Sequence, residues 1–287
     1  MLTFTNQAAL SYRNRVRYSN LTTGQIADAL TVTKEALTGT YAPGEDVTYV
    51  VRLTNNGTAA LTGLTLTDDL GGYVFDGGTL YPLSYVENSL RFYVNGAEQP
   101  LPAVTPGAPL SVSGIDLPAG GNGLLLYEAA VTEFAPLGAE GTIVNTVTAT
   151  GAGLAAPVTA TATIAADDEP ELSILKDLSP ETVGADRQVV YTFTIQNRGN
   201  TATGAGDDLT VTDTFDPTLS NLAVTLNGAP LAQAGNYTYD EATGVFATVA
   251  GVVSVPAAAF TQDPVTGVIT VEPGETVLTV TGTIETA

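Results

Sequence analysis

The sequence predicts an all-β protein built from two successive domains. Thr, Val, Ala and Gly are prominent among its 287 residues, and short runs alternate apolar with polar side chains without a long helical period. One order of strands and turns also occurs twice along the chain. Because a chain of this length can form two domains of ordinary size, each with its own core, we expect two β-rich domains in tandem.

The two copies of the repeat match strand by strand. Each copy opens with a strand that carries a lysine, LTVTKEA from Leu30 and LSILKDL from Leu172. Two further strands follow in each copy, starting at Val47 and Leu64 in the first and at Val189 and Leu209 in the second. An Asn-Gly hairpin turn, and then a Pro/Gly turn before an apolar strand, occur in both. Internal similarity of this kind predicts two domains of equivalent structure.

The closing part of the repeat is displaced. The first copy ends with residues 142–165, which read as two strands around a Gly/Ala/Pro turn, whereas the second copy shows no such pair before Ala287. The N-terminal segment has a similar order and length, with Asn6 matching Asn145 and Ile26-Ala27 matching Ile164-Ala165. We therefore divide the chain into an N-terminal extension of donor strands (residues 1–27), a first domain (28–167) and a second domain without closing strands (168–287).

The N-terminal segment is suited to complete a neighbouring molecule. Alternation places one set of its side chains on a single face: Phe4, Asn6, Ala8, Leu10 and Tyr12. A strand added from a neighbour satisfies main-chain hydrogen bonds and fills alternate side-chain pockets. Because donor and acceptor surfaces differ, such contacts are head-to-tail and grow into a fibre unless they close into a ring. The alternative is that residues 1–27 fold back on their own second domain.

The charge distribution supports a docking arm. The net charge is −21, and all 30 acidic side chains lie in residues 28–287, whereas residues 1–27 carry only the basic Arg13, Arg15 and Arg17. A basic arm on an acidic body favours attraction between copies, which makes the arginines candidate interface residues. The alternative is a solvated terminus. So acidic a surface argues against nucleic acid as a partner.

Three polar residue types recur on inward faces. The two lysines of the chain, Lys34 and Lys176, occupy equivalent positions in the two repeats, in phase with apolar neighbours. Asp68 and Asp213 also share a face with apolar residues of their strands. Asn145 is in phase with Ile143 and Val147, and Asn6 with Phe4 and Ala8. Buried polar groups are costly unless they are paired, so this set requires a structural or a chemical role.

Two roles fit this set equally well. One is a buried Lys–Asp salt bridge with an Asn hydrogen-bonded beside it, a pairing that often adds little stability. The other is a spontaneous Lys–Asn isopeptide bond, in which a desolvated neutral lysine attacks the amide while the aspartic acid polarises it. The bond would be intramolecular for Lys34, Asp68 and Asn145. It would be intermolecular for Lys176, Asp213 and Asn6.

Composition removes many other classes of site. The chain has no His, Cys or Trp, so the common nucleophile–base pairs and transition-metal sites are unavailable, and we expect neither an enzyme nor a cofactor. The acidic runs could bind calcium, but they lack EF-hand spacing and fit solvated loops better, so we expect no metal. No stretch has the length and apolarity of a membrane span, and the N-terminus lacks the pattern of a signal peptide.

Several of these patterns together resemble a bacterial repeat family known as "domain of unknown function eleven". They are VTK at Val32, YAPGEDVTY at Tyr41, NNGT at Asn55, LTD at Leu66 and NTVT at Asn145. The second copy departs from the family at the turn VGADRQVVY. The resemblance implies an immunoglobulin-like β-sandwich for each repeat. The expected fold is therefore two tandem immunoglobulin-like β-sandwich domains with an N-terminal donor strand segment.

Within that family, a chain of two repeats without cysteine or secretion signal resembles the main structural subunits of clostridial endospore appendages. This resemblance implies synthesis in the mother cell and an extracellular location on an endospore or cell surface. We therefore expect a structural subunit whose partners are copies of itself, assembled by donor-strand complementation. The alternative is a cell-surface adhesin or stalk module that does not polymerise.

Overall fold

The protein is all-β, as predicted. The computed structural model describes residues 2–26 and 29–285, so Met1, Ala27 and three other terminal or linker positions lie outside the described residues. Within this part of the chain, the only helix is a single 3-10 turn at Ala205–Asp207, and no helix is long and apolar enough to cross a membrane. The chain divides into two compact units, residues 1–136 with 142–165 and residues 137–141 with 166–287.

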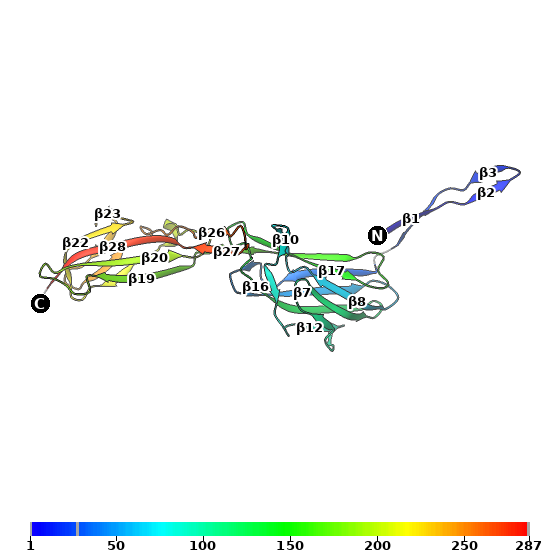
Figure 1. Ribbon diagram of the computed structural model, residues 1–287, viewed down its shortest axis with the longest axis horizontal. Coiled ribbons are helices and arrows are strands. Elements are labelled where there is room, and N and C mark those ends of the chain that lie inside the picture. The colour runs from blue at the N-terminus through cyan, green and yellow to red at the C-terminus, as the bar shows by residue number, and fades with distance from the viewer. Residues whose placement is uncertain (1, 27–28, 286–287) are drawn as a thin grey trace. The chain divides into compact units, whose positions relative to one another are not determined.

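The first unit contains an immunoglobulin-like sandwich of two sheets (Figure 1). One sheet has the strand order β13-β12-β16-β7-β5, with β11 also paired to β16, and the other has the order β14-β15-β8-β17-β18-β6. The strands are β5 (Leu30–Ala36), β6 (Thr40–Tyr41), β7 (Asp46–Asn55), β8 (Leu61–Asp68), β11 (Leu83–Tyr85), β12 (Arg91–Val94), β13 (Ala97–Glu98), β14 (Ala103–Thr105), β15 (Leu110–Leu117), β16 (Asn122–Val131), β17 (Thr142–Thr150) and β18 (Val158–Ala166). A small hairpin of β9 (Tyr73–Phe75) and β10 (Gly78–Leu80) accompanies them.

Alternation along the strands decides which side chains fill the core of this sandwich. On β5, every second residue from Leu30 to Lys34 is buried, and the residues between them are exposed. On β17, Ile143, Asn145, Val147 and Ala149 are buried in the same way. Strand β17 packs against β5 across the core, so the closing hairpin β17–β18 covers the inner face of β5.

The second unit has the same first sheet, in the order β19-β20-β28-β22-β23. Its other strands form two small sheets, β21-β25-β24 and β26-β27. The strands are β19 (Leu172–Ser179), β20 (Gln188–Asn197), β21 (Thr212–Thr214), β22 (Leu219–Leu226), β23 (Ala229–Leu231), β24 (Tyr237–Tyr239), β25 (Val245–Thr248), β26 (Ala259–Gln262), β27 (Ile269–Glu272) and β28 (Gly274–Ile284).

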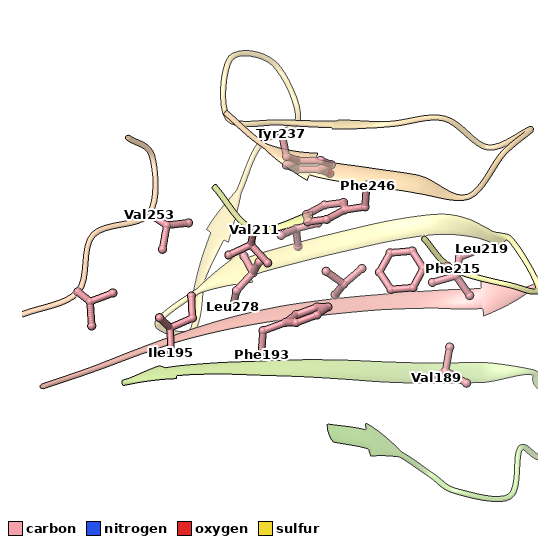
Figure 2. Close-up of a cluster of buried hydrophobic side chains, with 13 residues drawn as sticks. Val189, Phe193, Ile195, Val211, Phe215, Leu219, Tyr237, Phe246, Val253 and Leu278 are labelled. Carbon is pink, nitrogen blue, oxygen red and sulfur yellow. The ribbon is translucent and has the colours of Figure 1, made fainter. Parts of the chain in front are cut away.

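The core of the second unit is displaced away from β19. Its buried cluster joins β20 and β28 to β24, β25 and the segment around Val253, with Phe246 near the middle and Phe215 beside Leu219 (Figure 2). Among the described residues, no apolar side chain of β19 belongs to this cluster, although the Nζ atom of Lys176 lies 5.6 Å from the ring centres of Phe193 and Phe215. All eight residues of β19 are exposed, unlike those of its counterpart β5.

One hairpin accounts for this difference. In the first unit β8 pairs with β15 on one side and with β17 on the other. In the second unit the equivalent strand β21 pairs with β25 but is the edge of its sheet on the other side. Within residues 166–285, therefore, no counterpart of the β17–β18 hairpin is present.

The N-terminal segment forms a hairpin of its own (Figure 1). Strand β1 (Leu2–Asn6) pairs with β4 (Thr22–Ile26), and β2 (Ala9–Tyr12) pairs with β3 (Arg15–Tyr18). Arg13 and Asn14 form the connecting turn with φ angles of 43° and 63°, the left-handed pair that a two-residue type I′ turn requires. The predicted donor strands are thus one two-stranded ribbon, like the β17–β18 hairpin that they resemble.

The registers of the two hairpins correct one part of the sequence alignment. Ile143 pairs with Ile164 in the first sandwich, whereas the matching Phe4 pairs with Gly24 and Ile26 pairs with Leu2. The counterpart of Ile164 is therefore Gly24 rather than Ile26, while Ala27 is outside the described residues. The Phe4 ring lies directly over Gly24, because a Cβ atom at Gly24 would fall 2.4 Å from the ring.

Candidate functional sites

The first sandwich holds a buried charged pair at its centre. Lys34, on β5, places its Nζ atom 2.6 Å from Oδ2 of Asp68, the last residue of β8. The lysine side chain is completely buried and the aspartate side chain nearly so. The ammonium group also lies over two aromatic rings, 4.8 Å from the centre of Tyr49 and 5.9 Å from that of Tyr127. The sequence prediction that Lys34 and Asp68 face inward together is correct.

Two tyrosines that the sequence analysis did not single out complete the walls of this site. The Tyr127 hydroxyl donates a hydrogen bond to Asp68 Oδ2, and the Leu70 amide donates to Oδ1 at 3.1 Å. Tyr49 stacks on Tyr127 with ring centres 5.6 Å apart. Both tyrosines lie in phase with the buried apolar residues of β7 and β16, which is the signal that would have identified them.

Asn145 lies at the same site without a partner. It is fully buried, and among the described residues neither atom of its amide group makes a hydrogen bond. The amide lies close enough to the hydroxyls of Tyr49 and Tyr127 to oppose, in part, the rise in their pKa that burial causes. A buried polar group left unsatisfied costs roughly 1–3 kcal/mol. Asn145 therefore lies near the two tyrosines that line the Lys34–Asp68 pair, as a buried amide without a hydrogen-bond partner.

Burial prepares Lys34 for nucleophilic attack. Desolvation lowers the pKa of Lys34 to about 8 from its ordinary 10.5, and the charges of Asp68 and Asp69 offset only part of this effect. With a pKa of about 8, about a tenth of the amine is neutral at pH 7, against well under a thousandth for an ordinary lysine, and only the neutral amine could attack an amide carbon. Asp68, in contact with the Lys34 Nζ atom, could accept the proton that the amine would lose in such an attack.

The second sandwich contains the first two members of this set but in an open setting. Lys176 on β19 forms an ion pair with Asp213 on β21, and its Nζ atom lies 4.7 Å from the ring centre of Tyr191. The Lys176 side chain is 41% exposed, against 0% for Lys34. The predicted burial of Lys176 is therefore wrong for the chain taken alone, because no strand in the described residues covers that face of β19.

The uncovered face of β19 is apolar as well as open. Leu172, Ile174 and Leu178 are 40%, 54% and 40% exposed, whereas the equivalent Leu30 and Val32 of β5 are buried. Together with Lys176 and the free edge of β21, these residues form a surface that we call the acceptor face. An apolar strand face beside an unpaired sheet edge is a site for strand addition, or else for aggregation.

The N-terminal hairpin carries apolar side chains that are equally exposed. Phe4, Leu10 and Tyr12 are exposed, and so are Asn6 and Ala8, the other two residues that alternation predicted to share their face. The pairing of β2 with β3 sets Arg17 opposite Leu10 and Arg15 opposite Tyr12, so both arginines share that face near the tip. Arg13 lies in the turn, 5.1 Å over the Tyr12 ring.

Comparison with known proteins gives distant likenesses only. No family model matches the chain, and no curated protein matches it. Among solved structures, a variant of the major pilin subunit of Bacillus cereus matches with a TM-score of 0.38 and 11% identity over 86% of this chain and 65% of its own. A collagen-binding domain from a Staphylococcus aureus adhesin matches with a TM-score of 0.31 and 12% identity over 48% of this chain and 99% of its own.

A family 123 glycoside hydrolase from Clostridium perfringens matches at a similar level, with a TM-score of 0.31 and 9% identity over 48% of this chain and 27% of its own. Likenesses this weak extend to binding, structural and catalytic proteins alike, and they decide nothing about function.

The geometry of the first sandwich predicts a Lys34–Asn145 isopeptide bond. In an Asn6→Ser chain, which cannot react at the second site, we expect the intact mass to be lower than the sequence mass by one ammonia. Lys34→Met or Asn145→Ser, each combined with Asn6→Ser, should restore the full sequence mass. A tie between residues as distant as 34 and 145 is worth roughly 4–5 kcal/mol by loop-closure entropy, so both variants should also unfold more easily. An unmodified mass in the chain that retains Lys34 and Asn145 would leave only the salt bridge.

The pKa of Lys34 predicts a pH dependence in the unlinked protein. In the Asn145→Ser chain, Lys34 is protonated below pH 10.5 when unfolded but only below about 8 when folded, so the unfolded state binds more protons between these values. Stability should therefore rise with pH, by about 2 kcal/mol from pH 8 to 10, before ionisation of Tyr49 and Tyr127 in the unfolded state opposes it. Urea titrations would measure the rise, and the Lys34→Met, Asn145→Ser double variant should lack it.

Proposed function

We propose that this chain is a non-enzymatic subunit of an extracellular fibre, in which the N-terminal hairpin of one copy completes the second sandwich of the next. Each copy then acts as a donor through residues 2–26 and as an acceptor through its acceptor face. Donor and acceptor surfaces are different, so every junction is head-to-tail and each new subunit presents the same free surfaces again. A Lys34–Asn145 isopeptide bond ties β5 to β17 within the first sandwich of each subunit in this proposal.

The single observation that carries the proposal is the complete first sandwich beside the incomplete second one. In the first, the β17–β18 hairpin pairs with β8 and covers β5. In the second, β19 pairs with β20 and β21 pairs with β25, yet within residues 166–285 no strand covers β19 or pairs with the other edge of β21. The N-terminal hairpin is an antiparallel ribbon of the same kind with an exposed apolar face. Comparison of the two repeats thus indicates what the second sandwich lacks, a hairpin like β17–β18, and where such a hairpin would bind, the acceptor face.

The connections of the first sandwich favour docking between copies over docking within one copy. The N-terminal hairpin joins this sandwich just before Leu30, at the start of β5. The chain leaves for the second unit after Ala165, whose amide donates a hydrogen bond to Gly39, just past the other end of β5. Donor and acceptor are therefore attached at opposite ends of β5, as an open head-to-tail polymer requires.

Apolar contact supplies the larger share of the junction energy. Full burial of a Leu, Ile or Phe side chain contributes roughly 1.5–3 kcal/mol, and both surfaces offer several that are now 40% to 70% exposed. An exposed ion pair contributes about 0.2–1 kcal/mol. The arginines of the hairpin therefore act mainly on the rate of encounter with the acidic body, through attraction over a distance.

The surface of an endospore is the location that we propose, because of the family resemblance of the repeats. A fibre held by strand addition and isopeptide bonds needs no cysteine, and the chain has none. Fibres on sporulating cells labelled by an antibody against this chain would support the location; labelling confined to vegetative cells would reject it without affecting the assembly mechanism.

Removal of the hairpin should abolish fibres and leave both units folded. We expect a chain without residues 1–27 to remain monomeric at concentrations where the full chain forms long fibres by negative-stain microscopy. Circular dichroism and a cooperative melting transition should show retained β-structure. Fibres of unchanged appearance from the truncated chain would contradict the donor role.

A rearranged chain provides the matched control. In the first sandwich, residues 132–141 connect β16 to β17. A copy of residues 2–26 attached beyond the C-terminus of the truncated chain through a flexible linker of similar length should fill its own acceptor face. This variant should be a monomer that melts at a higher temperature than the truncated chain. Failure of the added copy to raise that temperature would show that the hairpin does not fit the acceptor face.

The charge of the hairpin should control the speed of assembly. Replacing Arg13, Arg15 and Arg17 by Gln should slow fibre growth most at low ionic strength, where attraction to the acidic body is least screened. Light scattering at a series of salt concentrations would measure the growth rate of each chain. The resistance of the finished fibres to denaturant should differ little between the two chains, because the arginines act mainly on the rate. Equal rates for both chains at every salt concentration would remove electrostatic attraction from the mechanism.

A further inference from the structure

The second sandwich contains two of the three groups that would form an isopeptide bond, the lysine and the aspartate, but not the asparagine. Lys176 and Asp213 are in contact, as Lys34 and Asp68 are in the first sandwich. Asn145 provides the third group in the first sandwich from strand β17, and that strand has no counterpart among the described residues of the second unit. The missing group is therefore an amide on the strand that would pair with β21.

We propose that Asn6 of a second copy is this missing group, and that docking is followed by an isopeptide bond between Lys176 Nζ and Asn6 Cγ. The inference rests on the proposed head-to-tail assembly and adds to it a covalent site shared by two molecules. Each junction then ends as an amide bond, and the finished fibre is one continuous covalent chain of subunits.

The register of the first sandwich assigns Asn6 to this position. There, Val147 of β17 lies opposite Asp68, and Asn145 precedes it by two residues on the same face. Asp213 takes the place of Asp68 in the second sandwich. Applied to a docked hairpin, the same register sets Ala8 opposite Asp213. Asn6 then precedes Ala8 by two residues and faces Lys176.

The same register brings opposite charges together at the tip of the hairpin. With Ala8 opposite Asp213, Tyr12 falls opposite Leu209, and the Arg13–Asn14 turn lies just beyond it. The exposed pair Asp207 and Asp208 immediately precedes Leu209. Two independent features of the hairpin, its asparagine and its arginines, thus find chemically matched partners in one alignment.

Docking also switches the reaction on. Lys176 is solvated in the free subunit, whereas burial lowers the pKa of its equivalent Lys34 to about 8. A neighbour's hairpin would cover Lys176 as β17 and β18 cover Lys34. The acceptor therefore stays unreactive in solution and becomes reactive only at a filled junction, so the bond is made after docking in the matched register.

The step is balanced without any cofactor. Transfer of one proton from Lys176 to Asp213 leaves a neutral amine and a carboxylic acid. The amine nitrogen attacks Asn6 Cγ, the new C–N bond forms, and the bond from Cγ to Nδ2 breaks. Asp213 delivers its proton to the leaving nitrogen and recovers one from the attacking nitrogen, and its return to the carboxylate releases a proton. The products are a secondary amide, ammonia and that proton, which combine to ammonium in water.

Full-length fibres boiled in detergent provide the first test. We expect a ladder of covalent oligomers on electrophoresis. In fibres of the Asn145→Ser chain, which cannot form the bond in the first sandwich, we also expect a tryptic peptide in which Met1–Arg13 is joined to Phe92–Arg187 with the loss of one ammonia. Asn6→Ser should still form fibres, since strand pairing does not need the amide, but its fibres should dissolve to monomers. Lys176→Arg, which keeps the charge and most of the stem, should behave in the same way.

A mixture of these two variants separates bonds between copies from bonds within one copy. The Lys176→Arg chain can only donate Asn6, and the Asn6→Ser chain can only offer Lys176. The mixed fibres should therefore yield a covalent dimer and nothing larger, whereas either variant alone yields monomer.

If boiled wild-type fibres give only monomers, and the peptides that contain Asn6 and Lys176 are not joined, the covalent inference is wrong while the proposed fibre is unaffected. If Lys176 and Asn6 are joined but the mixture gives no dimer, the bond lies within one chain and the inference is equally wrong. If no variant with an intact hairpin forms fibres, the proposed assembly itself is wrong.

Discussion

A β-sandwich buries the apolar face of one sheet only where strands of the other sheet lie across it, and this constraint accounts for the main features of the protein. Strand β5 can carry Leu30, Val32 and Lys34 inward because β17 and β18 cover them. Strand β19 has the same pattern of side chains, but within residues 166–285 only Asp213 and Phe215 of the opposite layer approach it, at Lys176, and all eight of its residues stay exposed. The second core consequently contracts toward β20, β28 and the β24–β25 hairpin, and leaves an apolar face that only an added strand can bury.

The buried lysine of the first sandwich is difficult to explain by stability alone. A buried ion pair often gives no more stability than well-packed apolar residues in its place, because desolvation costs about as much as the attraction returns. A salt bridge accounts for Lys34 and Asp68 but leaves the Asn145 amide buried without a partner. A bond-forming role accounts for all three, since the amine, the acid and the amide are the groups that the reaction consumes or uses. It also accounts for the position of the same two charged groups at the opening of the second sandwich.

The sequence was sufficient to predict the features that depend on the alternation of side chains along a strand and on comparison of the two repeats. The inward direction of Lys34, Asp68 and Asn145 followed from the period of two along each strand, and the structure confirms it. The absence of closing strands in the second repeat followed from comparison with residues 142–165. Both inferences use only local geometry, which short-range sequence patterns contain.

Features that depend on pairing between distant strands could not be predicted in this way. The place of Tyr49 and Tyr127 beside Lys34 depends on the register of β5 with β7 and of β7 with β16. The alignment of Ile26 with Ile164 was wrong because the Arg13–Asn14 turn and an irregularity after Asn6 together set the pairing of β1 with β4. At this irregularity, residues 7–8 of one strand lie opposite residues 19–21 of the other. The half-exposed Lys176 was missed because alternation gives the direction of a side chain but not what lies across from it.

A hairpin donor differs from a single donor strand in one respect that bears on reversibility. An isolated two-stranded hairpin is marginally stable in water, so part of the apolar energy released on docking is spent on ordering the donor itself. The net affinity of such a junction is lower than its contacts suggest, and a fibre held by it alone would exchange subunits. A bond formed only in the docked state removes this weakness, because the release of a subunit then requires the cleavage of an amide rather than the loss of strand pairing. Weak initial docking is useful in the same scheme, since a hairpin in the wrong register can leave before any bond forms.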